Sequence, residues 1–98
     1  MRRDEAIRCL KAEAEALRSH GAEALFLFGS TLRDEAGPGS DLDLFVDLAP
    51  HRRVTLFDLL AMRRLLEERT GAEVDLTTRD ALHPLIKESI EASAVRVF

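Results

Sequence analysis

The sequence predicts an α/β (α+β) fold in which a mixed sheet of about four strands is covered by three main helices. Three observations support this prediction. Helical and strand-like segments alternate along the chain, the strand-like segments are strongly apolar, and no repeat or linker divides the 98 residues. A chain of this length has room for one hydrophobic core, so residues 1–98 are expected to form a single domain.

The first part of the chain is predicted to contain a helix, a strand and a short helical turn. Residues 4–19 repeat apolar side chains at intervals of three and four, as one face of a helix does. The apolar run ALFLFG at 24–29 ends in glycine and is typical of a central strand. TLRDEA at 31–36 is expected to make one helical turn before the turn sequence GPGS at 37–40.

A second strand and a second long helix are predicted next. In DLDLFVDL, residues 41–48, Leu and Val occupy every second position, so one face of this strand is apolar. Pro50 follows its end. Residues 55–69 carry a wide apolar stripe at helical spacing, and Gly71 is expected to end that helix.

The last part of the chain is predicted to add a strand at 73–78, a helix at 82–93 and a terminal strand at 95–98. The strands are too apolar to face water on both sides, so helices are expected to cover the sheet. The connection between the strands at 24–29 and 41–48 is barely long enough for a helical crossover. That pair is therefore predicted to be antiparallel.

The composition excludes several classes of protein. Hydrophobic residues make up 46% and charged residues 33% of the chain, which is typical of a soluble globular protein. No apolar run approaches the roughly 20 residues that span a bilayer, and the N-terminus lacks the apolar region of a signal peptide, so a cytoplasmic location without membrane attachment is expected. The net charge of −4 argues against direct binding of nucleic acid.

Two aspartates interrupt the predicted strand at 41–48. Side chains two residues apart on a strand project from the same face, so Asp41 and Asp43 can lean toward a common point. Asp75 should face the same way if its strand is a neighbour, because Val74 and Leu76 would point to the core. Carboxylates and phosphate oxygens are ligands that Mg²⁺ prefers, and three carboxylates can hold two metal ions.

Simpler interpretations exist for some of these residues. Asp41 alone could be an ordinary turn residue after GPGS, and Asp47, on the same face near Pro50, is predicted to be solvated. Gly29 would let a phosphate approach the backbone, and Ser30 with the N–H groups of a helix start could bind an anion, although Ser30 could also be only an N-cap.

Together these features resemble a known family. Gly29-Ser30, ten intervening residues and then Asp41-Leu42-Asp43 resemble the G-S-x10-D-x-D signature of the DNA polymerase β-like nucleotidyltransferase superfamily. The small size is similar to its minimal nucleotidyltransferase (MNT) branch. The resemblance extends to Arg33 and Ala36 of the linking turn, to the acid in EVDLTT and to the ALHPLIKESI stretch. Family members commonly carry Gly where this chain has Asp34, and a second basic residue near Gly37.

The resemblance implies a palm-like nucleotidyltransferase domain and a set of site residues. Gly29, Ser30 and Arg33 would bind the nucleotide, while Asp41, Asp43 and Asp75 would be the catalytic acids and bind two Mg²⁺ ions. In the family, a hydroxyl activated by metal attacks the α-phosphorus of ATP, and pyrophosphate leaves.

The resemblance also implies a partner. A palm-like sheet of 98 residues has little left to hold an acceptor, and minimal nucleotidyltransferases of this kind resemble MntA-type antitoxins, which transfer AMP to a tyrosine of a HEPN ribonuclease toxin. Two alternatives remain open: a small-molecule nucleotidyltransferase with its substrate-binding domain in another chain, and a catalytically vestigial module that inhibits its partner by contact. An apolar helix surface could serve a partner protein or a homo-oligomer.

Overall fold

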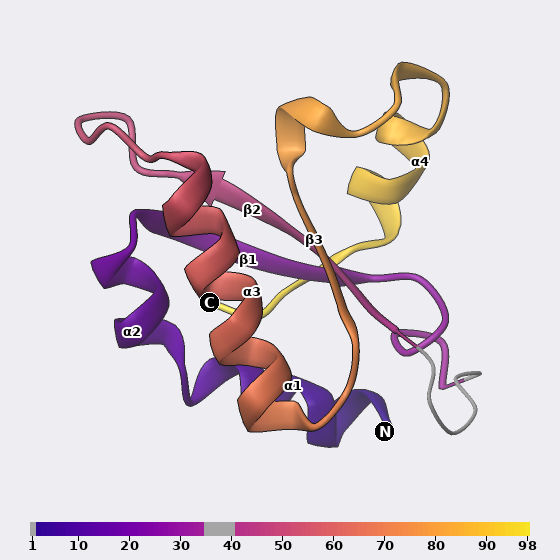
Figure 1. Cartoon of the computed structure of the whole chain (residues 1–98). Coiled ribbons are helices and arrows are strands. Elements are labelled where there is room, and N and C mark those ends of the chain that lie inside the picture. Colours follow the sequence, from indigo (N-terminus) through magenta and orange to yellow (C-terminus); the bar gives the residue numbers. More distant parts are fainter. Residues whose placement is uncertain (1, 35–40) are drawn as a thin grey trace.

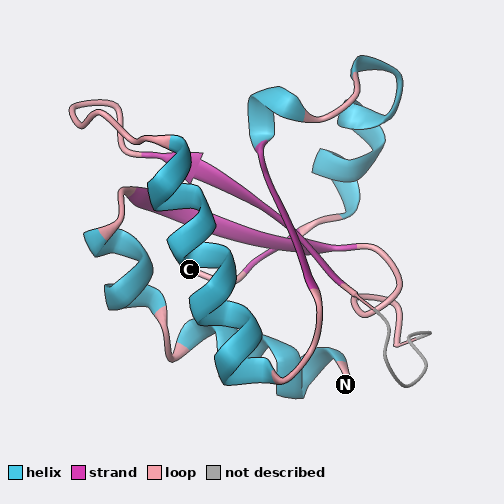
Figure 2. Ribbon diagram, viewed as in Figure 1, coloured by secondary structure: helices cyan, strands magenta, loops and turns pink. Residues whose placement is uncertain are grey.

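The computed structural model describes residues 2–34 and 41–98 and shows a helix-covered sheet (Figures 1 and 2). The predicted turn at 37–40, the end of the turn at 31–36, Ala36 and Gly37 lie outside these residues. In the described part of the chain the elements are α1 (Arg3–Lys11), α2 (Ala14–Ser19), β1 (Ala22–Phe28), β2 (Leu42–Leu48), α3 (Leu56–Thr70), β3 (Val74–Thr78), the 3₁₀ turn η1 (Arg79–Ala81), α4 (Pro84–Ser93) and β4 (Val95–Arg96).

The predicted helix at 4–19 is two helices, and this is the main correction to the predicted elements. The backbone N–H of Glu13 donates to the carbonyl of Leu10, three residues back, so the last turn of α1 tightens before α2 begins. Neither glycine nor proline occurs between α1 and α2. The hydrophobic periodicity continues through the break, which is why it predicted one helix.

The sheet has the strand order β3-β2-β1-β4. β1 pairs antiparallel with β2, as predicted, and antiparallel with β4, while β2 and β3 are parallel. The sheet is therefore mixed. α3 makes the crossover between the parallel strands, and it begins in a capping box at Thr55 and ends at Gly71, which is left-handed with φ 69°.

The hydrophobic core lies on one side of the sheet, beneath α1, α2 and α3 (Figure 1). Alternate residues of β2 point into it, as the apolar period of two predicted. The residues of this core that are at most 1% exposed are Ala6, Leu10, Leu17, Leu25, Leu27, Leu42, Leu44, Val46, Met62 and Leu66.

The opposite face of the sheet is less covered. α4 lies on that side, near one end of the sheet (Figures 1 and 2), and no residue of α4 is buried. Asp43, Phe45 and Asp47 of β2 face this side, and Phe45 forms an aromatic strip with Phe26 and Phe28 of β1. The rings of Phe26 and Phe45 stack with their centroids 4.7 Å apart, and Phe28 lies 5.9 Å from Phe45. Here we call this side the open face.

None of the helices in residues 2–34 and 41–98 is long and apolar enough to cross a membrane.

Candidate functional site

Two of the three predicted acids are direct neighbours in the sheet. Asp43 on β2 is the register partner of Asp75 on β3, and because these strands are parallel, both side chains project from the open face. Asp41 precedes β2 by one residue and lies next to this pair. The structure places Asp43 and Asp75 side by side on one sheet face, with Asp41 close enough to act on Asp43 electrostatically, while the roles of all three acids remain predictions.

The electrostatic environment of Asp43 is that of a crowded acid. Partial burial raises the pKa of Asp43, and the negative charges of Asp75 and Asp41 raise it further. The positive charge of Arg33 opposes these effects and lowers the pKa. The ionised form of Asp43 is therefore disfavoured unless additional positive charge is bound nearby.

Asp41 interacts with a fourth acid that the sequence had not suggested. Its carboxyl group lies close to that of Glu73, and this proximity raises the pKa of Glu73. A hollow of about 230 Å³ lies beside these two residues and is also lined by Arg63 and Asp75. Glu73 directly precedes β3, and only the parallel pairing of β2 with β3 brings it to Asp41. Its backbone carbonyl accepts from Leu42 N–H at 2.8 Å.

Gly29 lies against the carboxylate of Asp43. Phe28 is the register partner of Asp43, so the chain leaves β1 directly over this acid. A Cβ atom added to Gly29 would overlap Oδ2 of Asp43 and would lie 3.1 Å from Cγ. The φ of Gly29 is also positive, at 81°. Both the space and the backbone conformation therefore require glycine at this position.

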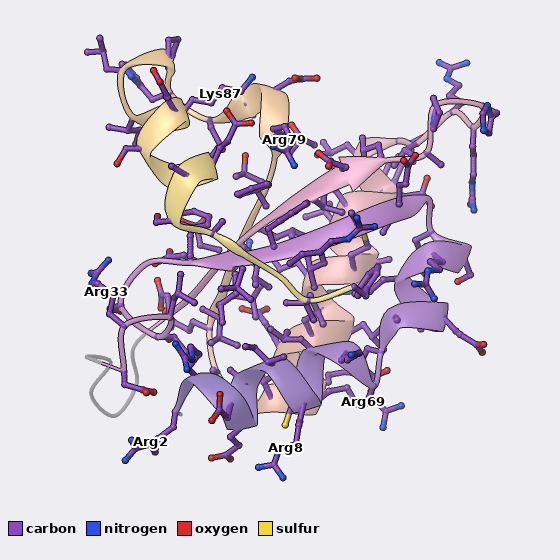
Figure 3. The ribbon with its side chains drawn as sticks, turned by 180° about the vertical axis from the view of Figure 1, so that it is seen from behind. Arg2, Arg8, Arg33, Arg69, Arg79 and Lys87 are labelled. Atoms are coloured by element: carbon purple, nitrogen blue, oxygen red, sulfur yellow. The ribbon has the colours of Figure 1, made fainter. Side chains whose placement is uncertain are left out.

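The segment after Gly29 is a series of turns. Arg33 N–H donates to the carbonyl of Ser30 at 3.2 Å, and Asp34 N–H donates to the carbonyl of Thr31 at 3.1 Å. Thr31 is only 1% exposed and anchors the turn, whereas Ser30 is partly exposed beside Gly29. Arg33 lies at this end of the sheet (Figure 3) and acts electrostatically on Asp43. Gly29, Ser30 and Arg33 are thus brought together with the acids, as the motif spacing predicts.

Asp34 has a structural role at the end of this turn. Its φ is 56°, in the left-handed region that glycine adopts most easily and that aspartate tolerates better than most residues. Its Oδ1 accepts a hydrogen bond of 2.7 Å from the backbone N–H of Arg3, the first residue of α1. The side chain of Arg2, at the N-cap, makes no capping bond, so Asp34 supplies an acceptor at this helix end.

The prediction for Asp47, at the other end of the open face, was wrong. Asp47 is half-buried and accepts two hydrogen bonds from Arg79, from Nε at 2.7 Å and from an Nη at 2.9 Å. Arg79 also donates to Glu91 of α4 at 2.5 Å, and its guanidinium carbon lies 4.8 Å and 4.9 Å from the ring centroids of Phe26 and Phe45. These two carboxylates raise the pKa of Arg79.

The two ends of the open face therefore differ in how their carboxylates are paired. Near Arg79, which Figure 3 shows beside α4, the carboxylates of Asp47 and Glu91 are each compensated by a direct bond to the guanidinium. At Asp43 the charges of Asp41 and Asp75 act on a third carboxylate, and the charge of Arg33 offsets only part of this repulsion. This group of hard oxygen donors fits a site for divalent cations such as Mg²⁺.

The acids do not yet form a complete cage for a metal. Within residues 2–34 and 41–98, no three His, Cys, Asp or Glu side chains are gathered around one point in a metal-binding arrangement. The carboxyl group of Asp41 lies beside that of Glu73, as described above. A cation that used all three predicted ligands would need Asp41, Asp43 and Asp75 to converge further than they do here.

Comparison with known proteins agrees with this geometry. The family model of the nucleotidyltransferase domain matches residues 9–97. A Methanocaldococcus jannaschii protein named "Putative protein adenylyltransferase MJ0435" is 38% identical over 81 residues, which cover 83% of this chain and 85% of that protein.

Solved structures share the fold. One described as a "putative minimal nucleotidyltransferase" is 32% identical, with a TM-score of 0.81 over 97% of this chain and 95% of that chain. A second structure holds a tri-AMPylated Shewanella oneidensis HEPN toxin in complex with an MNT antitoxin. It matches with a TM-score of 0.64 and 15% identity over 94% of this chain and 71% of that chain, and at this identity it supports the fold alone.

The family match covers the whole sheet, including the turn at Gly29 and the strands that carry Asp43 and Asp75. The chain therefore belongs to the nucleotidyltransferase domain family, and it is a nucleotidyltransferase.

Proposed function

We propose that this single-domain protein transfers AMP from ATP to a tyrosine hydroxyl of a HEPN ribonuclease toxin in the cytoplasm and acts as its antitoxin. One observation carries the proposal: Asp43 and Asp75 are register partners at the end of the open face, directly beside the Gly29 turn. The name of the M. jannaschii relative supports transfer of AMP to protein, and the AMPylated HEPN toxin in a structural neighbour supports the class of acceptor.

In this proposal each end of the site has its own task. The partly exposed backbone at Gly29 and Ser30 approaches the triphosphate, because no side chain at Gly29 blocks it, and Arg33 contributes positive charge. Asp41, Asp43 and Asp75 would hold Mg²⁺, which supplies neutralisation of the phosphate charge when bound. The tyrosine hydroxyl loses its proton to solvent as a new bond joins its oxygen to the α-phosphorus, the bond from that phosphorus to the bridging oxygen breaks, and pyrophosphate leaves.

The role of Asp34 bears on the alternative of a vestigial module. Asp34 departs from the glycine common in the family, which could have meant a damaged nucleotide site. Its carboxylate instead bonds to the start of α1, and its backbone occupies the conformation that glycine would adopt. The substitution therefore has a structural explanation that does not require loss of catalysis.

An AMP transfer assay tests the proposal. The chain is incubated with Mg²⁺, α-labelled ATP and the all-helical protein encoded beside it, and the labelled residue is located by mass spectrometry. We expect label on a tyrosine of the helical protein, lost on addition of EDTA. Asp43→Asn should reduce transfer by on the order of 10³-fold, because a charge on which the transition state depends has been removed.

Asp80→Asn is the matched control. Asp80 is an acid in η1. Its side chain is 98% exposed, and it lies outside the proposed site. This variant should transfer AMP at the wild-type rate. If Asp43→Asn still labels the partner, the catalytic assignment is wrong. If Asp43→Asn fails to label the partner but still inhibits its ribonuclease activity as well as wild type does, inhibition by contact replaces the proposed mechanism.

A further inference from the structure

The outer side of α3 carries a stripe of residues that do not belong to the hydrophobic core. Phe57, Ala61, Arg64 and Glu68 recur at intervals of four, three and four residues, which places them along one side of the helix. This side is opposite to Met62 and Leu66, the buried residues of α3. Leu60 borders the stripe.

Several large apolar side chains on this part of α3 are exposed to solvent. Phe57 is 81% exposed, Leu56 69% and Leu60 44%. Single exposed apolar residues are normal on a protein surface, but three within one and a half turns form a patch of the kind that protein interfaces use.

The stripe forms one wall of a groove, and α2 forms the other. The groove has a volume of about 660 Å³ and is lined on the α2 side by Ala16, Ser19 and His20. Figure 1 shows α2 and α3 side by side on the same side of the sheet. Ala16 and Ser19 on the α2 wall and Ala61 on the α3 wall are small, which leaves room there for a helix to lie close to the backbone.

Two charges beside the stripe can pair between copies. Arg53 precedes the N-terminus of α3 and is exposed, whereas Glu68 lies near the C-terminus of the same helix and is also exposed. An antiparallel copy of α3 reverses this order, so Arg53 of one copy faces Glu68 of the other, although the exposed Arg64 and Arg69 add positive charge near Glu68. Antiparallel helix dipoles also attract one another.

We infer that two copies of this chain associate through α3, packed antiparallel about a two-fold axis near Leu60 and Ala61. Such an axis makes the contact isologous, so the same groove and the same protruding ring are used twice. It places Phe57 over Arg64 of the partner subunit, where a cation–π contact can form, and Arg53 beside Glu68 of the partner subunit. The apolar centre and the charged ends are then covered at once.

This arrangement leaves the candidate site free. α3 packs on the core side of the sheet (Figure 1), whereas Asp43 and Asp75 project from the open face, so both copies keep their open faces accessible to nucleotide and acceptor. The inference concerns a different surface from the proposed transfer reaction, and neither depends on the other.

Sedimentation velocity of the full chain tests the inference. We expect the species to shift from the 11.0 kDa monomer toward twice that mass as concentration rises to roughly 100 μM. Phe57→Glu should raise the dimer dissociation constant at least about 100-fold, as removal of a central aromatic anchor does. Its circular dichroism spectrum should be unchanged, because the ring is 81% exposed in the single chain.

A charge-reversal pair tests the antiparallel geometry itself. Arg53→Glu and Glu68→Arg should each weaken the dimer, and the double variant should restore it, because the reversed charges meet again across the axis. Leu85→Glu is the control for an exposed apolar residue elsewhere, since Leu85 on α4 is 87% exposed, and it should leave the dimer intact.

Three results would overturn the inference. One is a wild-type chain that stays monomeric at roughly 100 μM. Another is a dimer that Leu85→Glu disrupts and Phe57→Glu does not, which would move the interface to α4. The third is a dimer whose charge-reversal double variant is weaker than either single variant, which would exclude the antiparallel pairing.

Discussion

On one face of β2, Leu42, Leu44 and Val46 are at most 1% exposed and pack in the helix-covered core, whereas on the other face of the same strand Asp43 lies among carboxylates. The first face is stabilised by burial of apolar area. The second contains charge repulsion that weakens the native state unless a cation binds. One strand of seven residues therefore serves stability on one side and chemistry on the other.

Substitutions at adjacent positions of β2 should change the free energy of unfolding in opposite ways, and these are the largest differences we expect between the two faces. Leu44→Ala is expected to lower the free energy of unfolding by about 3 kcal/mol, because it removes buried methyl groups and leaves a cavity. Asp43→Asn is expected to leave that free energy unchanged or to raise it. Urea denaturation at pH 7 without divalent cations measures both.

The sign for Asp43 follows from its raised pKa in the folded state. The ionised carboxylate is less favourable in the native protein than in the unfolded chain, so stability from this group is lost as the pH rises through its folded pKa. Asparagine removes the charge that causes the loss. A clear destabilisation by Asp43→Asn in the absence of metal would contradict the repulsion described here.

Gly29 and Gly71 offer the next largest contrast. Both have positive φ values, 81° and 69°, so alanine is strained at either position. Only at Gly29 would the new methyl group also overlap Asp43, since no atom lies within 4 Å of the Cβ position at Gly71. We expect Gly29→Ala to cost about 2 to 3 kcal/mol of stability and Gly71→Ala about 1 kcal/mol.

Thermal unfolding of the two glycine variants provides the measurement. Combining Gly29→Ala with Asp43→Asn or with Asp43→Ala tests whether the overlap with the Asp43 carboxylate causes the loss of stability. Asp43→Ala removes the overlapping oxygen, so it should recover part of the loss, whereas Asp43→Asn, which keeps an atom there, should not. Equal losses for Gly29→Ala and Gly71→Ala would show that the carboxylate moves aside without cost.

Much of the site was predictable because its elements are local in the sequence. The period of two in DLDLFVDL sets Asp41 and Asp43 apart from the leucines, and the same reasoning orients Asp75. The antiparallel pairing of β1 and β2 followed from the short connection between them. These inferences need only the strand period and the length of a loop.

The remaining features depend on contacts between residues far apart in the sequence. Arg79 and Asp47 are 32 positions apart and Arg3 and Asp34 are 31 apart, so no spacing rule links them. The pairing of Asp41 with Glu73 likewise requires the parallel register of β2 and β3. A charged residue on a strand indicates that a partner or ligand exists, but it does not say which.

At the compensated end of the open face, Arg79 is expected to hold α4 against the sheet. α4 has no buried residue, so its docking depends on few contacts, and the Arg79–Glu91 bond is one of them. Arg79→Gln should speed amide hydrogen exchange in residues 84–93 by about tenfold, because a charge-assisted hydrogen bond is lost. Mass spectrometry of exchanged peptides measures the rate.

Lys87→Gln is the matched control for Arg79→Gln. Lys87 also links α4 to η1, but its ammonium group lies 3.8 Å from a carboxylate of Asp80 whose side chain is 98% exposed, and such pairs contribute little. Exchange in α4 should change less than about threefold. A larger effect from Lys87→Gln than from Arg79→Gln would show that the stacked and bidentate contacts of Arg79 are not what holds the helix.

The smallest expected effect is at the start of α3, on the helix-covered side. Thr55 and Asp58 form a capping box, with Thr55 N–H donating to the Asp58 carboxylate at 3.0 Å, and Thr55→Ala should cost about 1 kcal/mol of stability.

The pKa of Asp58 in this capping box is lowered, first by the hydrogen bond from the Thr55 backbone and then by the bond from His20. The stability that ionised Asp58 contributes is therefore present above its unfolded pKa of about 4 and is lost as the pH falls through the folded pKa. Urea denaturation between pH 7 and pH 3 should therefore show wild type more stable than Asp58→Asn at pH 7, with the difference shrinking in acid. This direction is opposite to that at Asp43, where the folded pKa is raised. A gap between wild type and Asp58→Asn that widens in acid would show that hydrogen bonding does not favour the ionised form of Asp58.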